Sequence, residues 1–177
     1  TRPVGTPDDL RGMRLRVPPS PMSMSIFRAL QAAPTSINFS ETYSALQTRI
    51  VEGQENPLTL VSSAKLYEVQ KYCSLTNHVW DGFWMLGNSA SFARLPADMQ
   101  AVVSKHINAA VVAQRDDLAK LQGSIRDTLK DKGLELVESP PEPFRARLQS
   151  ANYYSEWHDK FGDAPWAILE KYAGKLA

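Results

Sequence analysis

An arginine at the end of a short strand-like run is the residue of this sequence best placed to bind an acid. Arg16 lies in residues 13–17, where apolar and polar side chains alternate as in a strand, and a Pro-Pro pair ends that run at once. Open α/β sheets bind ligands at the carboxyl ends of strands, and a guanidinium offers a rigid pair of donors to a carboxylate. The alternative, which position alone favours, is an internal ion pair with Glu41 or Glu55.

Three further side chains are candidates for the same site, each with a structural alternative. Asn56 carries an amide donor and acceptor, although Asn before Pro is typical of a helix N-cap, and we expect the cap. Phe39 ends a second predicted strand, where its ring would cover a ligand or belong to the core. His78 closes a later β-rich run, where it would donate to an anion, act as a base, or serve the structure only.

None of the common catalytic constellations occurs in the sequence. Cys73 and His78 lie on one β-like run at positions that face opposite sides of a regular strand. There is no Gly-x-Ser-x-Gly elbow and no glycine-rich phosphate loop, and His106 and His158 have no partner at a metal-binding spacing. No catalytic or metal-binding motif remains, so we expect no catalytic residues, no cofactor and no metal.

Strands and helices must alternate to position these side chains, as in the α/β class. Apolar alternation predicts strands at residues 13–17, 35–39, 72–78, 79–86 and 134–137. Helical spacing and capping residues predict helices from Ser20 to Pro34, from Ser40 through Ile50, after Asn56, at 88–92, at 97–132, and twice after a Pro-rich turn at 140–143.

One predicted helix is too long for the chain that carries it. Apolar residues at helical spacing run from Ala97 to Lys132 and stop at Gly133, a good C-cap residue. About 36 residues at 1.5 Å each give roughly 54 Å, whereas a compact globule of this size is about 40 Å across. The helix must end early, kink at Gly123, or run along something larger than this chain.

Composition excludes several classes of protein. Of the 177 residues, 43% are hydrophobic and 22% charged, and the net charge is +1 without any basic run, which excludes a disordered chain and gives no basis for binding nucleic acid. The longest apolar run, 109–113, is far shorter than the roughly 20 residues of a bilayer span. The single cysteine, Cys73, excludes an internal disulfide, and a start at Thr1 without Met leads us to expect a processed or truncated product.

Several motifs, in their order along the chain, resemble one family of receptors. They are residues 10–18 (LRGMRLRVP), 38–48 (NFSETYSALQT), 53–57 (GQENP), 67–78 (YEVQKYCSLTNH) and 95–98 (LPAD). Together they resemble the solute-binding proteins of tripartite ATP-independent periplasmic (TRAP) transporters, the DctP-like family. The resemblance covers essentially the whole chain, and the ordered set is specific where any one motif would be weak.

This resemblance implies a periplasmic receptor that closes on a small organic acid and delivers it to membrane permease subunits. The acid would be a C4-dicarboxylate or a related keto, hydroxy or aromatic carboxylate. Arg16 would form the salt bridge to the ligand carboxylate, Asn56 and Phe39 would line the site, and His78 would lie near it. Trp80 would tolerate a flat or apolar acid, unless it packs the hinge strand together with Phe83 and Trp84.

The resemblance also implies that this chain is one lobe and part of another. The implied fold is an α/β, periplasmic-binding-protein type II-like lobe with a long inter-lobe helix and an N-terminal lobe that is largely missing. Residues 1–81 and 122–177 would form the second, ligand-binding lobe. Residues 82–121 would be a fragment of the first lobe with the hinge strand and the long helix. A complete member is nearly twice as long as this chain.

One position departs from the family pattern, and two other classes of function stay open. Pro19 stands where some relatives carry a polar side chain that contacts a sugar acid. The alternatives are a small α/β hydrolase that uses His78 with a distant Ser or Asp, and the ligand-sensing domain of a regulator.

Overall fold

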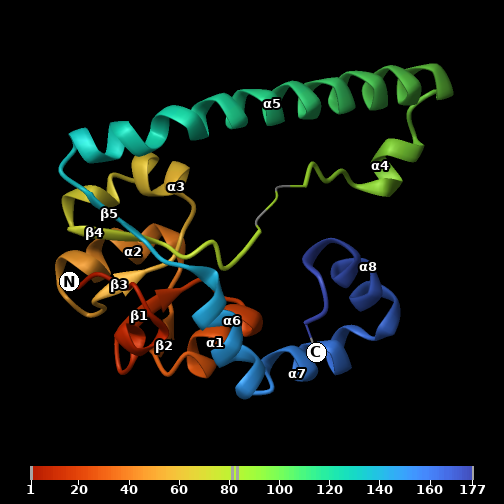
Figure 1. The fold of residues 1–177 in the computed structure, drawn as a ribbon. Coiled ribbons are helices and arrows are strands. Elements are labelled where there is room, and N and C mark those ends of the chain that lie inside the picture. Colours follow the sequence, from red (N-terminus) through yellow and green to blue (C-terminus); the bar gives the residue numbers. More distant parts are fainter. Residues whose placement is uncertain (1, 81, 83, 177) are drawn as a thin grey trace.

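Two separate parallel sheets organise the chain in the computed structural model, which describes residues 2–80, 82 and 84–176. One sheet has the order β2-β1-β3, and the other pairs β4 with β5. Helices connect the strands, which confirms the predicted α/β class (Figure 1). The strands are β1 (Arg14–Val17), β2 (Ala33–Ser36), β3 (Gly53–Gln54), β4 (Tyr72–Leu75) and β5 (Glu135–Glu138).

The helices lie on both sides of the strands. In Figure 1, α3 and one end of α5 lie above the β4–β5 pair, and α1 and α6 lie beside β1 and β2. Two short 3-10 turns accompany them, η1 (Pro7–Leu10) and η2 (Leu66–Glu68). The α-helices are α1 (Pro21–Ala29), α2 (Phe39–Gln47), α3 (Leu58–Ser63), α4 (Ser89–Ala93), α5 (Ala97–Asp131), α6 (Pro141–Ser150), α7 (Tyr153–Phe161) and α8 (Asp163–Ala173).

The first strand and helix follow the signals in the sequence. The Ser20 hydroxyl accepts a hydrogen bond from the Ser23 amide at 3.3 Å, and Pro21 takes the first helical position, as predicted. After α1 the chain reverses at Gln31, whose φ is +63°, and enters β2 beside β1. This βαβ unit leaves the carboxyl end of β1 at the edge where the next loops converge.

Two apolar cores support the two sheets. The first joins β1 to α1, α6 and α7, with Val17 and Leu30 at its centre. The second lies beneath α3 and the C-terminal end of α5, where Leu66 and Leu129 are fully buried. Apolar residues remote in sequence therefore fix the position of both sheets, and the turns between them are placed by that packing.

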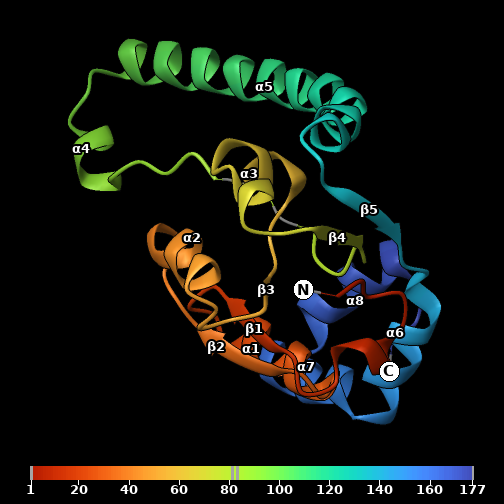
Figure 2. The ribbon, with the colours of Figure 1, turned by 90° about the vertical axis from the view of Figure 1, so that its left-hand side faces the viewer.

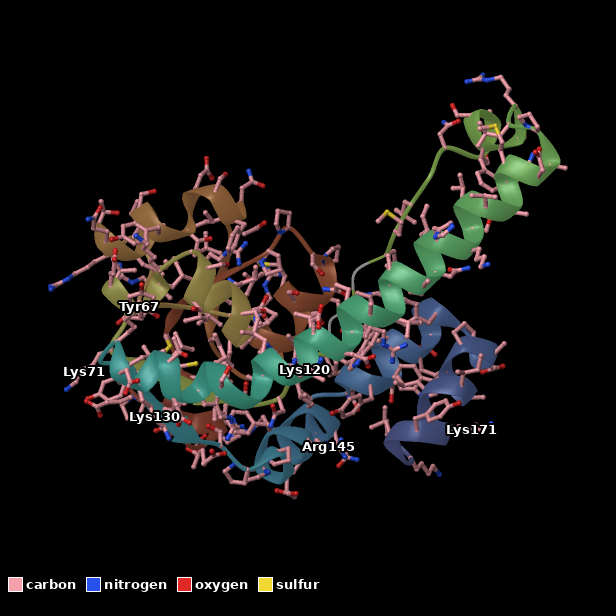
Figure 3. The ribbon with its side chains drawn as sticks, turned by 90° about the horizontal axis from the view of Figure 1, so that it is seen from above. Tyr67, Lys71, Lys120, Lys130, Arg145 and Lys171 are labelled. Carbon is pink, nitrogen blue, oxygen red and sulfur yellow. The ribbon has the colours of Figure 1, made fainter. Side chains whose placement is uncertain are left out.

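Helix α5 extends far beyond these cores. It runs unbroken through Gly123 for 35 residues, or about 52 Å, so it does not kink there. Its buried residues, Ile125 and Leu129, lie in the last two turns. Figures 1 and 2 show the opposite end reaching away from the sheets together with α4, and Figure 3 shows the Lys130 end lying over the body. Within the described residues, no helix is long and apolar enough to span a membrane.

The part of the chain beside the free end of α5 exposes many apolar side chains. Residues 79–80, 82 and 84–88 form no regular structure, so the strand expected at 79–86 is wrong for the described residues; Asp81 and Phe83 lie outside them. The β4–β5 ladder ends at Leu75 opposite Glu138, and a strand does not persist without a paired neighbour. Exposed side chains here and on α5 include Val79, Trp80, Trp84, Met85, Leu86, Met99, Val102 and Val112.

Two elements are shorter than the sequence predicts. Helix α1 ends at Ala29, and Pro34, its expected end, instead lies in β2. Strand β4 ends at Leu75 and does not reach His78.

Local boundaries also differ from the sequence expectations around α2 and in the C-terminal helices. The second strand ends at Ser36, and helix α2 begins at Phe39 with Asn38 in the N-cap position, so Phe39 does not end a strand and Ser40 is not a cap. The expected turn at 140–143 is instead the start of α6, because proline suits a first helical turn. Three helices rather than two follow it, since Gly162, with φ of +80°, separates α7 from α8.

Candidate functional site

Arg16 is a buried cation with one fixed end and one free end. It lies on β1 beside Thr35 and Gln54, and it is only 2% exposed. Its Nε donates a hydrogen bond to the Ile37 carbonyl at 2.9 Å. Within the described part of the chain, its two terminal nitrogens make no hydrogen bond and no ion pair. The ion pair with Glu41 or Glu55 that position alone favours is therefore not formed.

Glu55 nevertheless acts on Arg16 through its charge. Burial lowers the pKa of the Arg16 guanidinium, and the negative charge of Glu55 acts in the opposite direction. An arginine stays protonated in proteins, so burying this charge lowers the stability of the folded state. The negative charge of Glu55 offsets part of that loss. A guanidinium held at Nε and open at both terminal nitrogens has the geometry to receive the two oxygens of a carboxylate.

Phe39 covers the arginine from the first turn of α2. The guanidinium carbon of Arg16 lies 5.9 Å from the centre of the Phe39 ring, within cation–π range. The Phe39 side chain is 41% exposed, so its ring has one face toward Arg16 and another part open to solvent. The structure thus brings these two predicted residues together, although Phe39 belongs to a helix and not to the end of a strand.

Asn56 presents its side chain to the loop after β3 rather than to a helix. Pro57 occupies the N-cap position of α3, and the Asn56 side chain makes no capping hydrogen bond, so the expected cap is wrong. Its Nδ2 instead donates to the side-chain oxygen of Gln54. The amide is therefore held by the residue that pairs with Arg16 across the sheet, which leaves Asn56 Oδ1 as an acceptor for another group.

His78 is anchored at both ring nitrogens. Nδ1 lies 2.7 Å from Thr76 Oγ1, and Nε2 lies 3.3 Å from Glu55 Oε2. Because an ionised carboxylate only accepts, Nε2 of the neutral ring carries the proton and Nδ1 accepts from the Thr76 hydroxyl. Phe27 contacts the ring edge to face, with centroids 5.3 Å apart. His78 and Arg16 are thus linked through one carboxylate, Glu55.

A cavity between the two sheets joins several of these side chains. Its lining includes the loop after β3 on one side and the end of β4 on the other. Arg16 and Phe39 do not line this cavity, and they connect to it through the charge of Glu55. The polar residues of the lining that belong to the site are Gln54, Glu55, Asn56, Thr76 and His78.

Trp80 does not join this group. Its side chain is 87% exposed and does not line the cavity. The ring lies over Gly82, where an added Cβ would sit 2.6 Å from it, so any side chain at 82 would displace the ring. Trp84 is exposed as well, and Phe83 lies outside the described residues. A role for Trp80 stays a prediction that no contact in this chain supports.

Sequence reasoning missed Thr76 and Gln54, and it considered Glu55 only as a direct partner of Arg16. Thr76 had no reliable signal, because its contact with His78 forms across Asn77, whose φ is +46°, and not along an extended strand. Glu55 and Gln54 had none, since their roles depend on contacts with His78 and Asn56 that only the folded chain creates.

The described residues offer no sign of nucleophilic or metal chemistry. Burial raises the pKa of the Cys73 thiol to about 11, which keeps it protonated and unreactive at neutral pH. No group of three or more His, Cys, Asp or Glu side chains within the described ranges is placed to hold a metal ion. His158 pairs with Asp163 at 2.9 Å and stacks on Trp166, on the exposed turn between α7 and α8.

Comparison with known proteins identifies the family to which the sequence is similar. A family model described as "Bacterial extracellular solute-binding protein, family 7" (DctP) matches residues 1–160. The chain is 37% identical over 135 residues to the 2,3-diketo-L-gulonate-binding periplasmic protein YiaO of Escherichia coli, which covers 76% of this chain and 41% of that protein. It is 29% identical over 161 residues to the sialic acid-binding periplasmic protein SiaP of Vibrio cholerae, covering 91% and 50%.

Solved structures share the fold over most of the chain. A TRAP periplasmic solute-binding protein from a Polaromonas species, bound to D-erythronate, matches with a TM-score of 0.86 and 30% identity, over 92% of this chain and 53% of that one. One from Roseobacter denitrificans with bound L-galactonate matches with a TM-score of 0.80 and 36% identity, over 85% and 50%. The chain spans about half the length of the proteins it matches.

Proposed function

We propose that this chain, which belongs to bacterial extracellular solute-binding protein family 7, is the acid-binding part of a TRAP transporter receptor. One observation carries the proposal. Arg16 is buried, its Nε is fixed by the Ile37 carbonyl, and its two terminal nitrogens have no partner in the described chain. A buried guanidinium in that state gains most from a carboxylate that binds both nitrogens at once.

The neighbouring side chains complete the site around that salt bridge. Asn56 Oδ1 accepts from a ligand hydroxyl, and the His78 ring, held by Thr76 and Glu55, faces the same cavity. The Phe39 ring covers the ligand carboxylate and lowers the local dielectric constant, which strengthens its attraction to Arg16. The reaction is binding and release, and no bond of the ligand changes.

The ligand class follows from the site and from the relatives together. One free guanidinium selects a carboxylate, and the polar groups on the cavity side select hydroxyl or keto oxygens. Similar proteins are named for, or contain, 2,3-diketo-L-gulonate, sialic acid, D-erythronate and L-galactonate, all of them acids with several oxygens. These ligands favour a hydroxylated or keto monocarboxylate over an aromatic acid. They do so although the exposed Pro19, just after β1, stands where some relatives carry a polar side chain that contacts a sugar acid.

The exposed surfaces support the proposed division into lobes. Residues 1–81 and 122–177 carry both apolar cores, and 82–121 carries α4 and the part of α5 that buries nothing. We assign the first set to a ligand-binding lobe and the second to a fragment of another lobe. In a full receptor, that lobe would supply the other half of the cleft. Delivery to membrane permease subunits and a periplasmic location complete the proposal, by analogy with the family.

The hydrolase alternative has one geometric feature, a Thr76–His78–Glu55 chain of hydrogen bonds. In this chain of bonds the Thr76 hydroxyl lies at Nδ1 and the Glu55 carboxylate at Nε2. This is the reverse of the Ser-His-Asp arrangement, in which the nucleophile lies at Nε2 and the carboxylate at Nδ1. The relatives are solute-binding proteins, which favours a binding receptor over the hydrolase and over the regulator.

A substitution pair on β1 tests the proposal. Arg16→Ala removes the buried guanidinium, whereas Arg14→Ala removes an exposed arginine of the same strand that pairs with Glu52. Isothermal titration with D-erythronate, L-galactonate and 2,3-diketo-L-gulonate should show binding of at least one acid. We expect Arg16→Ala to cost at least about 2 kcal/mol of its affinity and Arg14→Ala to cost little. Equal losses for both variants would contradict the proposed site.

A further inference from the structure

We propose that His78 decides the charge class of the acid that this site accepts. With a neutral His78 the site takes a singly charged acid, and with a protonated His78 it gains a preference for doubly charged acids. The inference rests on the proposed binding function and adds a specificity rule to it.

The charges at the site almost cancel when His78 is neutral. Arg16 contributes one positive charge and Glu55, bonded to His78 Nε2, contributes one negative charge. A bound monocarboxylate therefore meets Arg16 and Glu55 with no net charge between them, and the open guanidinium of Arg16 pairs with one carboxylate only. Protonation of His78 adds one positive charge beside the same cavity.

Other charged and titratable groups of the described residues surround His78, and none of them is a histidine, the side chain type that ordinarily changes charge between mildly acidic and neutral pH. Glu55 faces the ring from the loop after β3, and Phe27 of α1 and Thr76 carry no charge. Farther along the cavity wall, Arg2 donates to the carbonyls of Asp9 and Arg11, and Glu52 is bonded to Arg14. Tyr72 and Cys73 are the other titratable residues of the lining. Histidine is the side chain type whose charge changes in this range.

The hydrogen bonds around His78 suit both of its charge states. The neutral ring donates from Nε2 to Glu55 and accepts at Nδ1 from the Thr76 hydroxyl, 2.7 Å away. The protonated ring still donates to Glu55, now as a charge-assisted bond, and donates from Nδ1 to the same Thr76 oxygen after its hydroxyl rotates. Protonation therefore changes the charge of the site without breaking a contact.

The size of the effect depends on the charge of the ligand. The electrostatic free energy of binding scales with the charge of the anion. A protonation that raises the affinity for a monoanion about threefold therefore raises the affinity for a dianion of the same shape about tenfold. The ratio of the two affinities therefore reports the added charge, and it cancels effects of pH on the fold that weaken both ligands alike.

A matched pair of acids measures that ratio. D-Gluconate and D-glucarate share a six-carbon hydroxylated chain and differ by one carboxylate. Isothermal titration of each acid at pH 7.5 and pH 5.5 should show gluconate favoured at the higher pH. The relative affinity for glucarate should rise at least about threefold at the lower pH. Binding at pH 6.5 should also take up protons, seen as a dependence of the heat on the ionisation enthalpy of the buffer.

Variants separate the charge of His78 from its structural role. His78→Gln and His78→Asn keep a polar side chain and cannot become charged, so the affinity ratio should not change with pH. His106→Gln, on the exposed face of α5, is the matched control and should keep the full change. If both His78 variants fail to fold, the NMR signal of His78 in the unchanged protein serves instead. Its protonated fraction at pH 6.5 should rise when gluconate is added.

The outcomes separate this inference from the proposed function. An affinity ratio that is the same at both pH values, or that still changes in the His78 variants, overturns the role of His78 alone. A His78 signal that does not respond to gluconate does the same. Absence of binding by either acid at either pH, with an intact fold, overturns the acid-binding site and this inference with it.

Discussion

Removing the charge of Glu55 should destabilise the empty protein because a buried arginine then loses its nearest counter-charge. Glu55→Gln keeps the size of the side chain and an oxygen that accepts from His78 Nε2, so it changes charge alone. Arg16 is 2% exposed and the Glu55 side chain 17% exposed, so water screens neither charge well. The expected effect therefore exceeds that of a surface pair.

Its magnitude follows from the arrangement of the two charges. They are not in direct ion-pair contact, and two unit charges farther apart than an ion pair, at an effective dielectric constant of about 20, attract by less than about 4 kcal/mol. The cost of keeping the Glu55 carboxylate partly out of water offsets part of this, leaving a net loss of about 1.5 kcal/mol for Glu55→Gln. Glu41→Gln is the control, since Glu41 is the other acid that the sequence offers as a partner and it lies exposed on α2.

Equilibrium unfolding in urea measures both variants. We expect the free energy of unfolding to fall by about 1.5 kcal/mol in Glu55→Gln and by less than about 0.5 kcal/mol in Glu41→Gln. Sodium formate should restore more stability to Glu55→Gln than sodium chloride at equal ionic strength, because a small carboxylate can bind Arg16. Equal effects of the two substitutions, or no loss in Glu55→Gln, would refute the assigned interaction.

Two further outcomes follow from burial and exposure. Burial raises the pKa of Cys73 from 9.0 to about 11, so the thiol keeps its proton to a higher pH in the folded state than in the unfolded state. The contribution of this thiol to stability is therefore full below pH 9 and is lost as the pH rises toward 11. Between about pH 8 and about pH 10.5, the free energy of unfolding should fall less in Cys73→Ser than in the unchanged protein. The exposed apolar residues of α5 should make the chain self-associate in sedimentation velocity, and the double substitution Val102→Glu and Val112→Glu should return it to a monomer, whereas Ile168→Glu on α8 should not.

Local signals in the sequence were sufficient for some elements. Strand β1 and helix α1 are bounded by an alternating run, a proline pair and a serine cap that all act within a few residues of one another. The long helix was predicted to within one residue of its end at Asp131, because its apolar spacing and Gly133 stop signal are local too. Arg16 was therefore correctly placed at the end of a strand.

Other predictions failed where contacts in the folded chain, and not the residue types of the segment, determine the local structure. The run at 79–86 has the residue types of a strand, but in the described residues no neighbouring strand extends far enough to pair with it. Asn56 has the residue type of a cap, but Gln54 takes its amide, and Pro57 takes the cap position. For the run at 79–86 the decisive factor is the lack of a distant strand to pair with, whereas for Asn56 it is the contacts of its own neighbours in the folded loop.

The role of Glu55 shows why the site could be located but not assembled from sequence. Position placed Glu55 near Arg16, yet no sequence signal shows that it also bonds His78 from the opposite side. Glu55 therefore acts on Arg16 through its charge and on His78 through a hydrogen bond, and the bond to His78 limits how much of the Arg16 charge Glu55 can neutralise.

Glu55 should therefore stabilise the empty site and oppose the filled one. Without ligand, its negative charge lowers the cost of burying Arg16. With an acid bound at the terminal nitrogens of Arg16, two carboxylates share one guanidinium and repel each other, unless His78 is protonated and takes the charge of Glu55 for itself. Affinity for an anion thus depends on how firmly His78 holds Glu55. A site built this way can release its ligand, because the group that stabilises the unliganded arginine remains beside it throughout.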